Sequence, residues 1–408
     1  MTAQANKADQ LFAGVKVLAV ARVIAAPFAA MQLALNGADV LTIENPEEGD
    51  SQRNSEWRPE WMGMGRAFLA FNLNKRSMTL AINTPEGQEI FRRLAKDADV
   101  IIENLRTGGM AKYGLAYEDI RKINPRIIYC SVTGYGQTGP KARDAGIDDA
   151  IQAASGMMSL TGTPESGPLK TGTTVVDFCS GYVSAFTIAG ALYQRTRTGV
   201  GQAIDLSMME VAMTMIGGEV TRAATSGDIP PLVGNGNGRG RYISNSFRCK
   251  EGHIMIAARA DNLRNRFFRA IDRTDIPQDP RFSTPEVARQ HLDELNAEVE
   301  KTMLTRTASE WETYLNEKGL PAMRVLSLAE AIKHPQIAAR KFLHTFPAEP
   351  GLPGLPSHTV PSAPYRFSVS STAVERHAPR LGEHTDTVLK DLGYTQEQIA
   401  KLREQKTV

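Results

Sequence analysis

The first half of the chain alternates short apolar segments with segments of helical pattern, and this alternation restricts the possible folds more than any other feature. Residues 15–20, for example, read VKVLAV and precede a helical pattern at 27–36. Strands that alternate with helices predict parallel βαβ units, and strands without polar alternation predict a sheet covered on both faces. We therefore expect an α/β fold with a large, open, mostly parallel, Rossmann-like sheet. Further strands are predicted at 40–44, 78–82, 100–103, 127–132 and 204–206, and further helices at 85–96, 117–123, 178–195 and 210–224.

The length of the chain and a change of composition predict a second domain. The chain has 408 residues, and single hydrophobic cores stop growing at about 250–300 residues. Residues 226–240 are rich in Gly, Pro and Asn, which is typical of a linker. A hairpin pattern at 242–257 and helical patterns at 261–271, 284–304 and 309–318 follow it. We expect a large α/β domain from residues 1–227, a smaller α+β domain at 228–330, and a return segment, 331–408, that completes the large domain.

The composition excludes several classes of function. Lys plus Arg number 47 and Asp plus Glu number 45, so a net charge of +2 gives no reason to expect a nucleic-acid or anionic-membrane partner. The three cysteines lie far apart without a CxxC pair, so we predict neither a disulfide framework nor a zinc site. The N-terminal segment lacks the pattern of a signal peptide, and no run of about 18 apolar residues is present. We expect a cytoplasmic protein that does not cross a membrane.

Cofactor and metal motifs are also missing from the sequence. No G-x-G-x-x-G opens a helix after a strand, because the glycine-rich segment at 234–240 follows no apolar strand. No phosphate-binding G-x-x-x-x-G-K-[ST] and no H-E-x-x-H zinc motif occur. We predict no metal and no tightly bound cofactor.

Asp177 follows the apolar run TTVV and precedes the strongest helical pattern of the chain. One interpretation is an N-cap, because Asp readily accepts a backbone N–H there. The other is a nucleophilic carboxylate whose tetrahedral intermediate would use the free amides of a helix start. The sequence pattern alone leaves both open.

Two loops are candidate ligand contacts. Lys75 and Arg76 lie in NLNKRS, which is either a solvated basic turn or a phosphate contact. Tyr135 lies in a Gly-Tyr-Gly segment directly after a predicted strand, which is either a flexible loop or part of a ligand site. Open α/β sheets bind ligands at the carboxyl ends of their strands.

Ordered segments along nearly the whole chain resemble the family III CoA-transferases. The segments are GVKVLAVARVIAAPFAAMQLALNGADVLTIE (14–44), FNLNKRSMTLAI (71–82), DVIIENLRTGGMAKYGL (99–115), NPRIIYCSVTGYGQTGP (124–140), VVDFCSG, GALYQRTRTGVGQAIDLSM (190–208) and LGEHTDTVLKDLGY. The resemblance implies a large α/β domain with a small domain, and two chains interlocked as a homodimer. It implies an enzyme that moves CoA from an acyl-CoA donor to a small or medium carboxylic acid. In that reaction Asp177 would form first a mixed anhydride and then an aspartyl-CoA thioester.

The resemblance also assigns contacts to CoA, which would enter as a substrate thioester. The family's CoA-contacting positions fall on Val23, Lys75, Asn104, Lys112 and Tyr135. Ile24 stands where oxalate-using members carry glutamine, which argues against oxalate as the acceptor. Succinyl-CoA or acetyl-CoA would be the donor. The segment Gly234–Gly240 is either a lid or a plain linker.

Two alternatives compete with this function. An α-methylacyl-CoA racemase or epimerase shares the fold, but it needs an acid and a base, and its histidine position is occupied here by Ile147. All seven histidines lie at or beyond His253. A non-catalytic CoA-binding protein is the second alternative, and the presence of Asp177 argues against it.

Overall fold

The chain forms two compact units. A computed structural model describes residues 9–55, 61, 63–236, 243–348 and 355–408. The larger unit comprises Met1–Met157, Thr171–Gly217 and Ala338–Val408, and the smaller one Met158–Lys170 and Gly218–Ile337. The predicted domain boundaries at residues 228 and 330 remain a prediction.

The larger unit is built on a six-stranded, all-parallel sheet in the order β3-β2-β1-β4-β5-β8. The large, mostly parallel α/β sheet expected from the sequence is therefore confirmed. β1 lies between β2 and β4, so the strand order reverses there. The strands are β1 (Lys16–Val20), β2 (Asp39–Glu44), β3 (Arg76–Thr79), β4 (Val100–Glu103), β5 (Ile128–Thr133) and β8 (Gln202–Ser207).

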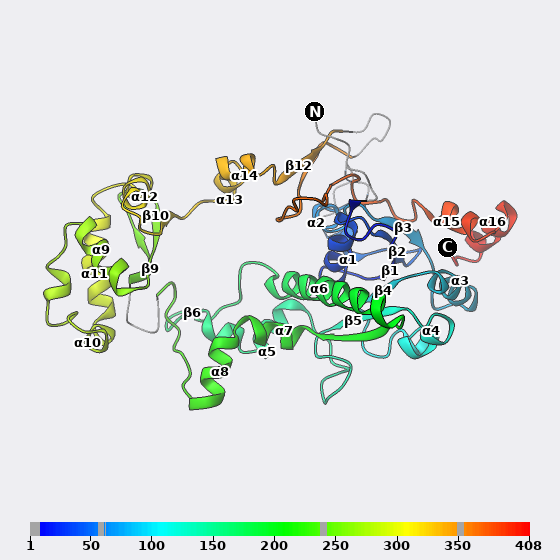
Figure 1. Cartoon of the computed structure of the whole chain (residues 1–408), viewed down its shortest axis with the longest axis horizontal. Coiled ribbons are helices and arrows are strands. Elements are labelled where there is room, and N and C mark those ends of the chain that lie inside the picture. The colour runs from blue at the N-terminus through cyan, green and yellow to red at the C-terminus, as the bar shows by residue number, and fades with distance from the viewer. Residues whose placement is uncertain (1–8, 56–60, 62, 237–242, 349–354) are drawn as a thin grey trace. The chain divides into compact units, whose positions relative to one another are not determined.

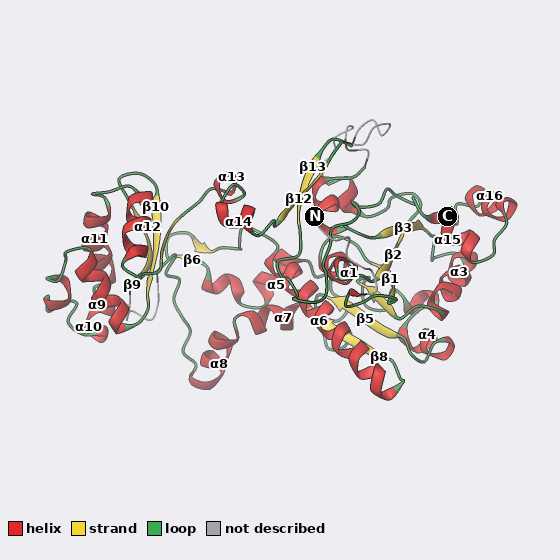
Figure 2. Ribbon diagram, turned by 45° about the horizontal axis from the view of Figure 1, so that its top comes forward, coloured by secondary structure: helices red, strands yellow, loops and turns green. Residues whose placement is uncertain are grey.

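Helices cover both faces of this sheet (Figure 2). Alternate strand residues point to opposite faces, so Val17 and Ala19 belong to one core and Leu18 and Val20 to the other. The first core is closed by α1 (Ala25–Leu35), α5 (Asp148–Ala154), α6 (Val175–Thr198) and α7 (Met208–Met215). The second is closed by α3 (Pro85–Lys96), α4 (Tyr117–Ile123), α15 (Thr385–Asp391) and α16 (Gln396–Glu404).

The C-terminal part of the chain, Ala338–Val408, belongs to the larger unit. Figure 1 shows α15 and α16 beside α3, and Val388 and Leu389 share a core with Phe91. The remaining elements of this unit are α2 (Arg66–Phe71), β12 (Leu343–Phe346), β13 (His358–Pro361) and the short 3-10 helices η2 (Ser51–Arg53) and η4 (Ala111–Tyr113).

The smaller unit is an antiparallel sheet, β11-β10-β9, packed against helices. It confirms the predicted hairpin, and β11 (Ala322–Arg324) is a strand that the sequence analysis missed. The helix predicted at 284–304 is wrong as one element, because His291, with φ −124°, leaves the helical region and divides it. Its elements are β9 (Ile243–Arg248), β10 (His253–Ala258), α8 (Gly217–Ser226), α9 (Asp261–Ala270), α10 (Pro285–Gln290), α11 (Leu292–Met303), α12 (Ala308–Glu317), α13 (Leu328–Ala331) and η6 (Ile276–Gln278). The small pair β6 (Gly162–Thr163) with β7 (Gly167–Pro168) also belongs to the smaller unit, and η5 (Met157–Leu160), α8 and α14 (Pro335–Ala339) cross the unit boundaries.

The long helix α6 packs on α1 at a glycine. A Cβ added to Gly181 would lie 2.7 Å from Phe28 Cδ1 and 2.9 Å from the Ala25 carbonyl oxygen. The lack of a side chain at Gly181 therefore allows the two helices to approach this closely. Within the described ranges, α6 is also the one helix long and apolar enough to cross a membrane, which is weak evidence because core helices meet the same criterion.

We expect Gly181→Ala to lower the free energy of unfolding by about 1–3 kcal/mol, because the added methyl group overpacks the α1–α6 contact. Gly190→Ala on the same helix is the matched control, since a Cβ there meets no atom within 4 Å. This control should be neutral or stabilising by about 0.5–1 kcal/mol through helix propensity. Thermal unfolding of the two variants checks the prediction, and equal stabilities would contradict it.

Candidate active site

A cavity of about 300 Å³ lies at the carboxyl ends of the central strands of the larger unit. It is formed by the segments that follow β1, β4 and β5 and by the first turn of α6. The strand order reverses between β1 and β4, and such a reversal opens the crevice in which α/β sheets bind ligands. The lining residues used below are Arg22, Val23, Ile24, Asn104, Arg106, Asp144, Gly146, Ile147 and Asp177.

Asp177 lies in the first turn of α6, with its side chain in the cavity wall. The helix begins at Val175 and its N-cap is Thr174, whose side chain makes no capping hydrogen bond. Of the two interpretations that the sequence left open for Asp177, the N-cap is therefore wrong, and α6 already includes the two valines of the preceding TTVV run. Asp177 is 8% exposed, so this residue of the first helical turn is buried rather than solvated.

The backbone N–H of Asp177 is held by a second carboxylate. It donates to Asp148 Oδ2 at 2.9 Å. Asp148 Oδ1 accepts from Gln152 Nε2, and Gln152 Oε1 accepts from the Thr171 N–H at 2.9 Å. The amide of Asp177 is thus already used by the protein, so it is not one of the free helix-start amides expected to bind the oxyanion of an intermediate.

The electrostatic surroundings make Asp177 an unusually basic carboxylate. Burial, followed by the charges of Asp148 and Asp149, raises the pKa of Asp177 to about 7. A more basic carboxylate is a better nucleophile once it is ionised. The arrangement therefore fits covalent chemistry at Asp177 and a dependence on pH near neutrality.

Val23 and Asn104 line the same cavity as Asp177. Val23 lies in the turn between β1 and α1, with φ at +68°. Asn104 directly follows β4, and its side chain binds both backbone groups of Arg22, accepting from N–H at 2.9 Å and donating to O at 2.8 Å. Three residues singled out from the sequence, Asp177, Val23 and Asn104, therefore meet in one place.

Lys75 is 2% exposed, so the interpretation of its segment as a solvated basic turn is wrong for this side chain. Its Nζ donates to the Pro27 carbonyl at 2.7 Å, to the Phe71 carbonyl at 3.1 Å and to Asn72 Oδ1 at 2.6 Å. An ammonium group has three donors, and all three are used. Burial lowers the pKa of Lys75 to about 7, against the opposing charges of Asp50 and Glu44. The predicted contact of Lys75 with a phosphate is therefore corrected to an internal link between α1 and the end of α2.

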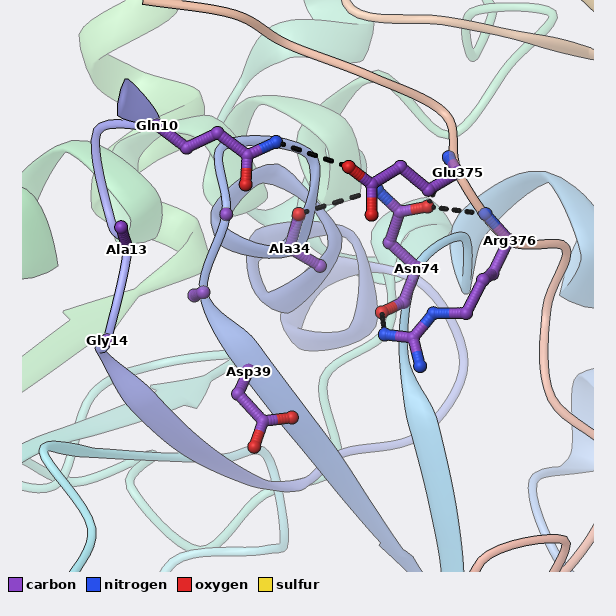
Figure 3. Close-up of a pocket in the computed structure, with 10 residues that line it drawn as sticks. Gln10, Ala13, Gly14, Ala34, Asp39, Asn74, Glu375 and Arg376 are labelled. Atoms are coloured by element: carbon purple, nitrogen blue, oxygen red, sulfur yellow. Dashed lines mark hydrogen bonds between the residues drawn. The ribbon is translucent and has the colours of Figure 1, made fainter. Parts of the chain in front are cut away.

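The neighbouring Asn74 binds the backbone of the C-terminal return segment (Figure 3). Its Oδ1 accepts the Glu375 and Arg376 N–H groups at 2.8 and 2.9 Å, and its Nδ2 donates to the Ala373 carbonyl at 2.7 Å. Asn74 precedes β3, so it lies at the amino edge of the sheet, opposite the cavity that contains Asp177. The pocket in Figure 3 is thus a structural junction that binds the C-terminal return segment.

Lys112 and Tyr135 are not among the residues that line the cavity. Lys112 is exposed, and its Nζ lies 5.6 Å from the Tyr113 ring. Tyr135 is half-buried, and the Lys141 ammonium lies 5.4 Å from its ring. Their roles in binding CoA stay predictions.

Glycines bring the loop that carries Asp148 against the end of β5. A Cβ on Gly134 would lie 2.7 Å from the Gly146 Cα. Ile147, the position of the racemase histidine, is 67% exposed and lines the cavity. The cavity therefore has an aliphatic side chain where a two-base mechanism needs a titratable one. Of the segment Gly234–Gly240, expected to be either a lid or a plain linker, residues 237–240 lie outside the described part of the chain.

The comparisons with known proteins identify the family of the chain. Residues 12–385 match the sequence profile of CoA-transferase family III. The chain belongs to this family and is an enzyme.

A succinate–glutarate CoA-transferase from Agrobacterium fabrum is 35% identical over 403 residues, covering 96% of this chain and 98% of the relative. A succinyl-CoA–D-citramalate CoA-transferase from Chloroflexus aurantiacus is 30% identical, covering 97% of each chain. The crystal structure of a CAIB/BAIF family protein from Brucella suis has a TM-score of 0.82 at 32% identity, and the match covers 94% of this chain and 100% of that chain.

Two buried carboxylates at the site escaped the sequence analysis as functional residues. Asp148 belongs to the Gly146-Ile147-Asp148 segment, which drew attention only for its missing histidine. Asp50 accepts the Val23 N–H on Oδ1 at 3.2 Å. It lies in the loop after β2, where Arg53 forms a buried ion pair with Glu44 at 2.6 Å.

We predict that Asp148→Asn moves the acid limb of the pH profile of kcat/KM to lower pH by about 1 pH unit. In the covalent reaction that the family resemblance implies, the ionised Asp177 would be the reactive form, so activity should fall as pH drops through its pKa, and removing a neighbouring negative charge should lower that pKa. The kcat/KM profile reports groups of the free enzyme and is the measurement to make. Asp149→Asn, at an exposed position, should give a smaller change. An unmoved or raised acid limb in Asp148→Asn would contradict the prediction.

Proposed function

We propose that this enzyme transfers CoA from succinyl-CoA to a small or medium carboxylic acid other than oxalate, through covalent intermediates on Asp177. The observation that carries the proposal is a buried, basic carboxylate in a cavity at the strand reversal of a family III CoA-transferase. The Agrobacterium and Chloroflexus relatives, named for succinate with glutarate and for succinyl-CoA with D-citramalate, support dicarboxylates as substrates.

The charges of the cavity agree with anionic substrates. Arg22 and Arg106 line it, and neither has an acidic side chain within ion-pair distance among the described residues. Asp144, by contrast, pairs with Lys141 at 3.0 Å. The two guanidinium groups supply positive charge for a distal carboxylate or for the phosphates of CoA. Ile24 adds an apolar wall near them.

The proposed reaction proceeds in balanced steps. A carboxylate oxygen of Asp177 attacks the thioester carbonyl carbon, the C–S bond breaks, and CoA leaves as the thiolate. The thiolate then attacks the aspartyl carbonyl of the mixed anhydride, which releases the donor acid as a carboxylate and leaves an aspartyl-CoA thioester. The acceptor carboxylate attacks the aspartyl carbonyl of this thioester, which expels the CoA thiolate and forms a second anhydride. The thiolate then attacks the acceptor acyl carbon of that anhydride, which yields the acceptor CoA thioester and releases Asp177 as a carboxylate. Covalent catalysis divides one difficult exchange into easier ones, and a buried nucleophile limits hydrolysis of both intermediates.

CoA enters and leaves as a substrate, and we propose no tightly bound cofactor. We also propose that the chain works in the cytoplasm as an interlocked homodimer. Large aromatic side chains on α6 support association, since Phe186 is 77% exposed and Tyr193 is 66% exposed. A monomeric mass in light scattering at micromolar concentration would contradict the dimer.

A panel of acids incubated with succinyl-CoA tests the function, with the CoA esters identified by mass spectrometry. We expect CoA esters of small dicarboxylic or hydroxy acids and little oxalyl-CoA. If oxalate were the best acceptor, the inference from Ile24 would be wrong. If no acid accepted CoA while the α-proton of a branched acyl-CoA exchanged with solvent, the enzyme would be a racemase.

Asp177→Ala and Asp177→Asn should lower the rate of CoA exchange by at least about 10⁴-fold, because the covalent route is lost. Both variants should fold and bind CoA, because the Asp177 side chain is proposed to be a reactant and the fold does not depend on its contacts. Calorimetric CoA titration and thermal unfolding provide these controls. Substantial CoA transfer by folded Asp177→Ala would contradict the covalent mechanism.

A further inference from the structure

The turn between β1 and α1 has a strained backbone. Val23 has φ at +68°, in the left-handed region, where a β-branched residue is a true outlier. Its side chain is 38% exposed, so core packing does not account for the conformation. Such a conformation persists only where the surroundings enforce it, and it is often found at functional sites.

Asn104 holds the turn from the side of β4. Its amide oxygen accepts the Arg22 N–H at 2.9 Å and its amide nitrogen donates to the Arg22 carbonyl at 2.8 Å. Both backbone groups of the residue before Val23 are therefore fixed by one side chain. Because Asn104 directly follows β4 (Val100–Glu103), the sheet itself places this side chain.

Asp50 holds the turn from the side of β2. Its Oδ1 accepts the Val23 N–H at 3.2 Å and the Gln52 N–H at 2.9 Å. Its own N–H donates at 3.1 Å to Glu44, the last residue of β2, and Glu44 is in turn paired with Arg53. Asp50 is 2% exposed, so this chain of contacts from β2 to Val23 is shielded from water.

β1 lies between β2 and β4, so the turn that follows β1 is held by hydrogen bonds from the segments after both neighbouring strands. We propose that Asp50 and Asn104 are positioning residues, which hold the strained Arg22–Val23 backbone as a rigid wall of the cavity that contains Asp177. The wall fixes the acyl-CoA so that its thioester carbonyl meets the carboxylate in a reactive geometry. This inference rests on the proposed function, because its readout is CoA transfer.

The first test compares Asp50→Ala with Asp50→Asn. Loss of the acceptor should lower kcat/KM by about 10–100-fold, mainly through kcat, because misplacement by about 1 Å has this effect on a reaction that depends on orientation. Asp50→Asn keeps an acceptor oxygen and should stay within about 3-fold of the wild type. Asn104→Ala should resemble Asp50→Ala.

Asn74→Ala is the matched structural control. Asn74 also has positive φ and also binds two backbone N–H groups, but at the amino edge of the sheet (Figure 3). We expect it to lower the melting temperature and leave kcat within about 2-fold. If Asn74→Ala and Asp50→Ala reduced kcat equally, the effect of Asp50 would be one of stability, and the proposal would be overturned.

The second test addresses the strain itself and does not depend on the folding of Asp50→Ala. Glycine adopts positive φ without steric cost, so the melting temperature of Val23→Gly should be unchanged or higher. Glycine also leaves the backbone freer to move, so kcat/KM should fall by about 5-fold or more. Val23→Ala keeps the strain, loses the branched side chain, and should retain more activity. Equal losses in Val23→Gly and Val23→Ala, or none in Val23→Gly, would overturn the proposal.

The outcomes separate this inference from the function on which it rests. Full transfer by Asp50→Ala and Asn104→Ala, with Asp177→Ala inactive, would contradict the positioning role and leave the covalent mechanism intact. Transfer by folded Asp177→Ala would contradict the covalent mechanism, whatever the Asp50 and Asn104 variants did.

Discussion

The site depends on the position of β1, which pairs with β2 on one side and with β4 on the other. The chain leaves β1 for α1 on one face of the sheet, and it leaves β4 for α4 on the opposite face. The two connections diverge, and the crevice between them opens at the carboxyl ends of the strands. The cavity residues after β1 and β4 lie on either side of this divergence.

The helix α6 supplies Asp177, the proposed nucleophile, to that crevice. Its close contact with α1 at Gly181 fixes the helix over the sheet, and its first turn carries Asp177 to the cavity. Burial and the neighbouring Asp148 disfavour the ionised carboxylate, which stores free energy in the resting enzyme. In the proposed mechanism that free energy would be released when the carboxylate becomes a neutral anhydride or thioester, so the environment that destabilises the ionised Asp177 would favour its acylation.

Local patterns in the sequence predicted much of the fold. The apolar runs gave the strands of the large sheet, and β4, α3 and α4 have the predicted bounds. The family resemblance located Asp177, Val23 and Asn104, which share one cavity. The sequence also predicted a ligand site at the carboxyl ends of the strands, since this follows from parallel topology alone.

Contacts between distant segments were beyond such patterns. The burial of Lys75 depends on carbonyl groups of α1 and α2, and the role of Asp50 depends on a backbone N–H 27 residues away. Asp148 meets Asp177 across a separation of 29 residues. A polar residue in a loop has the same local pattern whether it faces water or a buried partner, so these assignments required the three-dimensional structure.

The most direct test of the account is to trap the acylated enzyme. The enzyme would be incubated with succinyl-CoA, treated with borohydride, digested and analysed by mass spectrometry. Borohydride reduces an aspartyl thioester or anhydride to the alcohol, so the account predicts that the modified peptide carries homoserine in place of Asp177. A fully active enzyme with an unmodified Asp177, or with the adduct on another residue, would contradict the central claim.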